Sequence, residues 1–225
     1  MTKTLLVGLD SACWEYLDPL LQAGRMPTLQ RLMDTGTSGI LHSTMPPWTP
    51  AAWATLVTGK QPGKHGIFDM LWRHGHEYEF TPTSARVRTG TPFWTRLNEH
   101  GVRVGLVNVP FTYPPEPLQG FVVCGFGTPP SATDVVQPPD AMQQILRRFG
   151  GYEPVVAAEL LRTASPEVIF EKESHHQSTQ VGIAAELATR HPVDVLVINL
   201  MFTDHANHKF PEMAQVQAAY CRSDA

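Results

Sequence analysis

Residues 45–59 read MPPWTPAAWATLVTG, a proline-flanked turn that leads directly into a short apolar helix. Pro50 suits the first helical position, because its missing backbone N–H would have no intrahelical partner there. We therefore expect Thr49 at the N-cap and Thr58-Gly59 at the end of the helix. Backbone N–H groups at a helix N-terminus favour an anion. The hydroxyl of Thr49 is thus placed to attack a phosphate ester, and a simple capping role is the alternative.

The composition is that of a globular protein, with 225 residues of which 42% are hydrophobic. The net charge is −4 and the chain has no run of basic residues, so the sequence does not indicate a groove that binds nucleic acid. An anionic substrate therefore needs local positive charge, most simply from metal ions. Cys13, Cys124 and Cys221 are odd in number and widely spaced, which argues against a disulfide framework and for a reducing compartment.

The sequence also bears on localisation. No apolar run reaches the ~18 residues that a membrane-spanning helix requires. The apolar core of the first ten residues is too short for a signal peptide, and Asp10 ends it. We therefore expect a cytoplasmic protein without a membrane segment, and the sequence leaves the oligomeric state unknown.

Short apolar runs alternate with helical patterns along the chain. The expected strands cover residues 4–9, 37–43, 102–109, 121–125 and 193–200, and those at 4–9 and 102–109 are expected to be buried. The expected helices cover residues 14–22, 27–33, 50–58, 92–100, 140–149, 166–190 and 211–221. This alternation predicts a three-layer α/β sandwich with a mainly parallel sheet. Loop or insertion segments are expected around 68–91 and 110–190.

Polar residues follow two of the expected strands. Asp10 comes directly after the first strand, and Asp204 comes shortly after the last. Ligands of parallel sheets bind outside the carboxyl ends of the strands, and Thr49 joins this edge if its turn opens there. If the segment after Asp204 is helical, His208 lies one turn away on the same face, where both side chains can bind one metal ion. Zinc suits a carboxylate and an imidazole, with manganese as second choice, and a solvated loop is the alternative.

Several motifs occur in an order that resembles a known family. They are Gly8-Leu9-Asp10, Met26-Pro27-Thr28-Leu29-Gln30-Arg31-Leu32, Pro46-Pro47-Trp48-Thr49-Pro50, Thr55-Leu56-Val57-Thr58-Gly59 and His65-Gly66-Ile67. Together they look like the N-terminal half of the type I phosphodiesterase/nucleotide pyrophosphatase family, in the alkaline phosphatase superfamily. Asp204 and His208 are similar to that family's next metal-ligand pair. The resemblance implies an alkaline-phosphatase-like fold, with residues 1–225 as the N-terminal portion of one catalytic domain.

The resemblance further implies a site for two divalent metal ions, most simply Zn²⁺, that acts on a small phosphorylated substrate. Asp10 and Thr49 would bind one metal, and Asp204 and His208 would bind the other. Thr49 would attack phosphorus and form a phospho-threonine, which water would then hydrolyse. This is the chemistry of a metal-dependent phosphodiesterase.

The sequence departs from the family pattern in two places. The family completes its site with an Asp-His pair in a Ser-Asp-His-Gly stretch and with a later His, and Ser223-Asp224 does not match because Ala225 follows. We therefore expect the chain to be a fragment or truncated reading frame whose own activity is in question. Met70 stands where nucleotide pyrophosphatases carry an Asn that binds phosphoryl oxygens, so nucleotide substrates are not assigned.

Two other functions remain open. One is a phosphomutase-like member of the same superfamily, whereas a sulfatase is disfavoured because sulfatases use a modified Cys or Ser where this chain has Thr49. The other is a non-catalytic or degenerate remnant that binds phosphorylated ligands without turnover. The missing ligands favour the remnant for the isolated chain.

Overall fold

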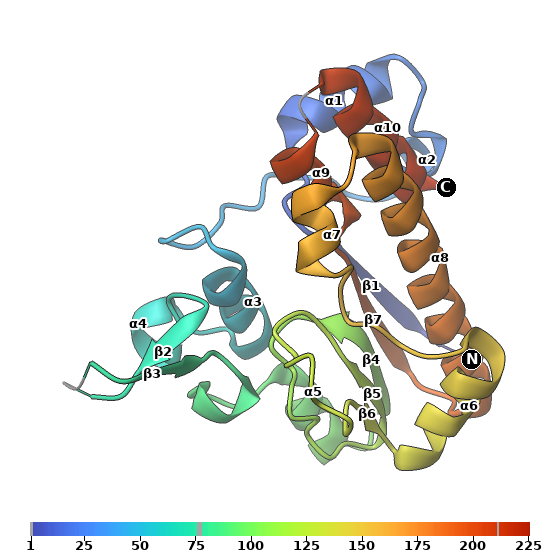
Figure 1. The fold of residues 1–225 in the computed structure, drawn as a ribbon. Coiled ribbons are helices and arrows are strands. Elements are labelled where there is room, and N and C mark those ends of the chain that lie inside the picture. Colours follow the sequence, from blue (N-terminus) through green and yellow to red (C-terminus); the bar gives the residue numbers. More distant parts are fainter. Residues whose placement is uncertain (1, 76–77, 211) are drawn as a thin grey trace. The chain divides into compact units, whose positions relative to one another are not determined.

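The computed structural model describes residues 2–75, 78–210 and 212–225, and Figure 1 shows its helices and strands. The chain divides into two compact units. Unit 1 comprises Met1–Val7, Ser43–Pro154 and Gln180–Asn199. Unit 2 comprises Gly8–His42, Val155–Thr179 and Leu200–Ala225. Each unit is described by itself below.

Most of the expected elements form. The strands are β1 (Thr4–Leu9), β2 (Leu71–Arg73), β3 (Phe80–Pro82), β4 (Val104–Val109), β5 (Gly120–Cys124), β6 (Val136–Gln137) and β7 (Val195–Leu200). The α-helices are α1 (Trp14–Gln22), α2 (Pro27–Thr35), α3 (Thr49–Thr58), α4 (Pro62–His65), α5 (Phe93–Glu99), α6 (Pro139–Phe149), α7 (Ala158–Thr163), α8 (Pro166–Arg190), α9 (Phe202–Lys209) and α10 (Met213–Asp224). A 3₁₀ turn, η1, covers Ala85–Val87.

Unit 1 is built on a sheet with the strand order β1-β7-β4-β5-β6. β4 runs parallel to β5 and to β7, whereas β6 runs antiparallel to β5. Every residue of β4 is buried, and a strand is buried on both sides only when both faces of its sheet are covered. Helix α5 packs against β4, α6 packs against β6, and the second half of α8 buries Ile183 and Leu187. The predicted α/β architecture with a mainly parallel sheet is therefore confirmed.

Two predictions about strands are wrong. β1 forms, but it is an edge strand on which Leu5 and Val7 are 60% and 49% exposed, not buried. The apolar run specifies the strand, whereas the topology decides whether anything covers it. The strand expected at 37–43 does not form, and Ile40 and Leu41 there are 75% and 86% exposed. No hydrogen-bonded partner strand lies beside that segment among the described residues, and β-propensity without a partner does not make a strand.

Unit 2 is mainly helical. Helices α1, α2, α9 and α10 and the first half of α8 surround a core of Leu17, Leu20, Met26, Ile169, Phe202, Ala206, Phe210, Val216, Ala219 and Tyr220. The carboxylate of Asp224 accepts hydrogen bonds from the backbone N–H groups of Thr28 and Leu29 at 2.9 and 2.7 Å. Asp224 therefore caps the N-terminus of α2, where N–H groups have no intrahelical partner.

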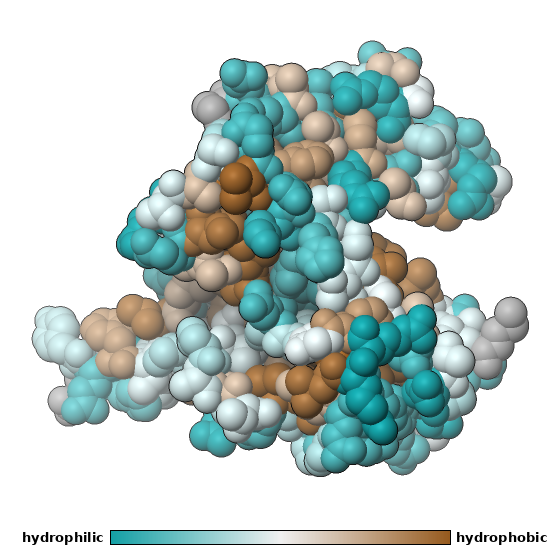
Figure 2. Space-filling model, turned by 45° about the vertical axis from the view of Figure 1, so that its right-hand side comes forward, coloured by the Kyte–Doolittle hydropathy of each residue, from teal (hydrophilic) through white to brown (hydrophobic). Residues whose placement is uncertain are grey.

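The surface carries several apolar patches between hydrophilic residues (Figure 2). Among the described residues, no helix combines the length and the apolar character that crossing a membrane requires.

Candidate functional site

Thr49 is the first residue of α3, with Trp48 as the N-cap and Pro50 at the second helical position. The predicted N-cap position is therefore wrong by one residue, while Gly59 ends the helix in the left-handed conformation as expected, with φ 64°. The side chain of Thr49 is partly buried, and its hydroxyl makes no hydrogen bond to any described residue. Capping thus does not account for this hydroxyl.

His65 ties the end of α4 to α3 in unit 1. The backbone N–H of Ile67 donates to Nδ1 of His65 at 3.1 Å, so the neutral ring carries its proton on Nε2. That nitrogen donates to Oγ1 of Thr55 at 2.9 Å. Burial lowers the pKa of His65, and the charge of Arg88 acts in the same direction. His65 is therefore a neutral structural link, not a metal ligand.

We predict that His65 makes unit 1 sensitive to mild acid. The folded pKa lies below the unfolded value of 6.5, so the unfolded state takes up the proton first as the pH falls. The stability that neutral His65 contributes is present above about pH 6.5 and is lost as the pH falls toward the folded pKa. Thermal unfolding from about pH 8 to about pH 5 should show a smaller fall in Tm for His65→Gln, which does not titrate, than for the wild type. Equal falls would contradict this assignment.

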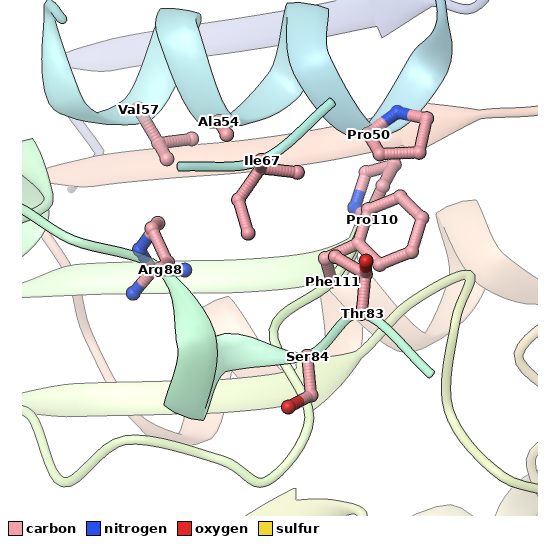
Figure 3. A pocket seen from close by; sticks show the side chains of 9 residues that line it. All are labelled: Pro50, Ala54, Val57, Ile67, Thr83, Ser84, Arg88, Pro110 and Phe111. Carbon is pink, nitrogen blue, oxygen red and sulfur yellow. The ribbon is translucent and has the colours of Figure 1, made fainter. Parts of the chain in front are cut away.

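A small cavity of about 10 Å³ lies in unit 1 between α3 and the segments at 83–88 and 110–111 (Figure 3). Nη2 of Arg88, whose side chain is 4% exposed, lies 2.8 Å from both carboxylate oxygens of Glu116. The guanidinium also lies 5.6 Å from the ring centroid of Trp94. Glu116 neutralises the arginine, and the cavity has room for about one water molecule. This cavity is therefore part of the packing of the unit and not a substrate site.

Asp204 and His208 lie on α9 in unit 2, so the helix on which their pairing depends is confirmed. Oδ1 of Asp204 and Nε2 of His208 are 3.5 Å apart, with side-chain exposures of 14% and 71%. Two ligands of one tetrahedral zinc, each about 2.0–2.1 Å from the metal, are about 3.3–3.4 Å apart. The pair therefore fits a shared metal ion. The helix dipole favours a carboxylate in the first turn and an imidazole in the last, which is how they are placed.

Asp10 follows β1 and lies beside the start of α9. Its backbone N–H donates to the carbonyl oxygen of Leu200 at 3.0 Å, and its carbonyl oxygen accepts from Oγ1 of Thr203 at 2.7 Å. Next to it, the hydroxyl of Ser11 donates to Oδ1 of Asp204 at 2.6 Å. The end of β1 and the first turn of α9 are therefore held together by hydrogen bonds within unit 2.

A buried pair of ionisable groups supports α9 from α8. Nδ1 of His205 and Oε1 of Glu173 are 2.5 Å apart, and the two residues are 8% and 1% exposed. Burial alone would lower the pKa of His205, but the hydrogen bond and charge of Glu173, together with the charges of Asp204 and Asp10, outweigh burial and raise it. The sequence does not single out His205, because no local pattern links it to a residue 32 positions away.

The predicted site residues divide between the two units. Asp10, Asp204 and His208 belong to unit 2, whereas Thr49 belongs to unit 1, and their convergence stays a prediction. Among the described residues, no three His, Cys, Asp or Glu side chains are grouped so that they could hold a metal ion. The fit to a metal therefore rests on the pair Asp204 and His208 and on the neighbouring Asp10.

The sheet is mainly parallel, and Asp10 and Asp204 come after its strands β1 and β7. The chain belongs to the type I phosphodiesterase/nucleotide pyrophosphatase family, whose family model matches residues 4–225. The family and the fold predicted from the sequence are thereby confirmed.

Two solved structures resemble the chain. Both are phosphonoacetate hydrolase from Sinorhizobium meliloti 1021, one in complex with phosphonoacetate and one with phosphonoformate, at a TM-score of 0.63 and 17% identity. The match covers 99% of this chain and 51% of theirs, so the chain spans about half the length of these structures. No curated protein sequence matches the chain significantly.

Proposed function

We propose that the chain is the part of a metal-dependent phosphate-ester hydrolase that carries the nucleophile, Thr49, and the ligands Asp10, Asp204 and His208. Membership of the phosphodiesterase family supports the reaction class. The observation that carries the proposal is the pairing of Asp204 and His208, whose ligand atoms are 3.5 Å apart on one face of α9. A carboxylate oxygen with an imidazole nitrogen is a donor set that suits Zn²⁺, and Mn²⁺ is the second choice.

The residues of the chain have separate roles in the proposed reaction. A bound divalent cation would supply positive charge that favours the ionised nucleophile and stabilises the charged phosphoryl group. The hydroxyl oxygen of Thr49 loses its proton and forms a bond to phosphorus, while the bond from phosphorus to the leaving oxygen breaks. Water then cleaves the phospho-threonine and restores the hydroxyl. Backbone N–H groups at the start of α3 favour the phosphate at that position.

A remnant that binds phosphorylated ligands without turnover is the second candidate. It is favoured by the lack of a third grouped ligand among the described residues. The two candidates differ in whether a phosphodiester is cleaved when metal is added. Because the related hydrolase structures contain phosphonoacetate and phosphonoformate, these small phosphonates are suitable competitors in a binding assay.

We predict that Asp204→Asn and His208→Ala each weaken the binding of Zn²⁺ by more than about 100-fold, because loss of a direct ligand should exceed the 10–100-fold effect of losing an outer partner. Calorimetric titration of the protein with Zn²⁺ measures this. His176→Ala is the control, since His176 lies on α8 away from the pair in sequence. Unchanged affinity in both ligand variants would reject the site. Hydrolysis of bis-p-nitrophenyl phosphate with Zn²⁺ then distinguishes the hydrolase from the remnant.

A further inference from the structure

The turn that follows β1 has an unusual residue at its third position. The backbone N–H of Ala12 donates to the carbonyl oxygen of Leu9 at 3.2 Å, which closes a turn over Asp10 and Ser11. Ser11 has a φ of 57°, in the left-handed region that favours glycine at this point of a turn. A serine in this conformation is strained relative to glycine. Backbone strain of this kind clusters at functional sites.

The side chain of Ser11 contacts a proposed metal ligand. Its hydroxyl donates to Oδ1 of Asp204 at 2.6 Å, and this is the same oxygen that lies 3.5 Å from Nε2 of His208. An ionised carboxylate oxygen has room for more than one partner. The hydroxyl can therefore fix the orientation of the carboxylate while Oδ1 still faces the imidazole.

Two side chains hydrogen-bond to the backbone carbonyl oxygen of Ser11. Its carbonyl oxygen accepts from Nδ2 of Asn207 at 3.0 Å and from the hydroxyl of Tyr220 at 3.3 Å. The same hydroxyl of Tyr220 accepts from Nδ2 of Asn207 at 3.2 Å. Burial raises the pKa of Tyr220 to about 12, so its hydroxyl keeps its proton and remains a donor at neutral pH. Tyr220 is completely buried, so the packing around it fixes its position next to Ser11.

We propose that Ser11 is a positioning residue of the metal site, held in its strained conformation by Asn207 and Tyr220 so that its hydroxyl orients the carboxylate of Asp204. The inference rests on the proposed function, because it assumes that Asp204 binds a cation. Outer partners of metal ligands that fix ligand orientation contribute 10–100-fold to metal affinity. One residue, Ser11, thereby forms part of the turn after β1 and also orients Asp204, the first proposed ligand on α9.

Two substitutions of Ser11 distinguish an effect on the orientation of Asp204 from an effect on the stability of the protein. Ser11→Ala removes the hydroxyl and keeps the strained backbone, whereas Ser11→Gly removes the hydroxyl and relieves the strain. We expect both to weaken Zn²⁺ binding by about 10-fold, while Tm is higher for Ser11→Gly than for Ser11→Ala. The affinity for Zn²⁺ would then depend on the presence of the hydroxyl, whereas Tm would depend on the backbone strain at residue 11. Tyr152→Phe is the control, because it removes a buried phenol that donates to the carbonyl oxygen of Cys124 at 2.7 Å in unit 1. It should lower Tm and leave Zn²⁺ affinity unchanged.

The experiment is calorimetric titration with Zn²⁺ together with thermal unfolding of each variant. Wild-type affinity in both Ser11 variants, with weaker binding in Asp204→Asn, would overturn the role of Ser11 and leave the metal site standing. Weaker binding in Ser11→Ala only would also overturn it, since affinity would then follow stability. If the wild type does not bind Zn²⁺, or Asp204→Asn binds as well as the wild type, the proposed metal site itself is rejected, and the role of Ser11 with it.

Discussion

Replacing Thr49 by alanine is expected to lower kcat for bis-p-nitrophenyl phosphate by at least about 10³-fold, because removal of a nucleophile removes the step on which the other groups act. The hydroxyl makes no hydrogen bond to any described residue, so its loss should leave Tm nearly unchanged. A large loss of kcat together with an unchanged Tm would identify Thr49 as a reacting group and not as a capping group. Loss of a helix cap lowers stability by about 1 kcal/mol.

Two variants accompany this measurement. Thr49→Ser retains a hydroxyl and should retain measurable hydrolysis. Thr58→Ala removes a hydroxyl at the other end of the same helix, where it donates to the carbonyl oxygen of Ala54 at 2.6 Å, and should leave the rate unchanged. Wild-type turnover by Thr49→Ala would reject Thr49 as the nucleophile. Binding of phosphonoacetate without any hydrolysis by the wild type would favour the non-catalytic remnant.

The parts of the site that sequence predicted are those governed by local geometry. A separation of four residues places Asp204 and His208 on one face of any helix, and the structure has that helix. Likewise, Pro50 and Gly59 bracket α3 because proline tolerates the first turn and glycine adopts the left-handed end. The error of one residue at Thr49 is of the size expected at helix termini.

The remaining parts depend on contacts between distant segments. Ser11 and Tyr220 are 209 positions apart, and nothing in either local sequence indicates their hydrogen bond. The strained φ of Ser11 is equally invisible, since a glycine would have marked the turn and a serine does not. The exposure of β1 has the same origin, because an apolar run cannot show whether another strand or helix will cover it.

Glu173→Ala is expected to lower the free energy of unfolding by about 3 kcal/mol, near the lower end of the range for breaking a buried ion pair. Glu173 is 1% exposed and bonds to Nδ1 of His205, so the alanine variant leaves a buried ring nitrogen without its partner and opens a cavity. The effect stays near the lower end because the imidazole can lose its proton. Glu173→Gln keeps a hydrogen-bond acceptor and should be less destabilising, whereas Glu171→Ala, an exposed change on the same helix, should have almost no effect.

The double variant Glu173→Ala/His205→Ala tests whether the two residues act as a pair. If they do, its destabilisation is smaller than the sum of the single losses, since removal of both partners leaves no unpaired buried group. Urea unfolding followed by circular dichroism measures the double variant, both single alanine variants (Glu173→Ala and His205→Ala), Glu173→Gln and Glu171→Ala. Strict additivity would show that each side chain contributes only by its own packing. Coupling would instead show that α8 holds α9 through this hydrogen bond, and therefore holds the helix on which Asp204 and His208 are placed.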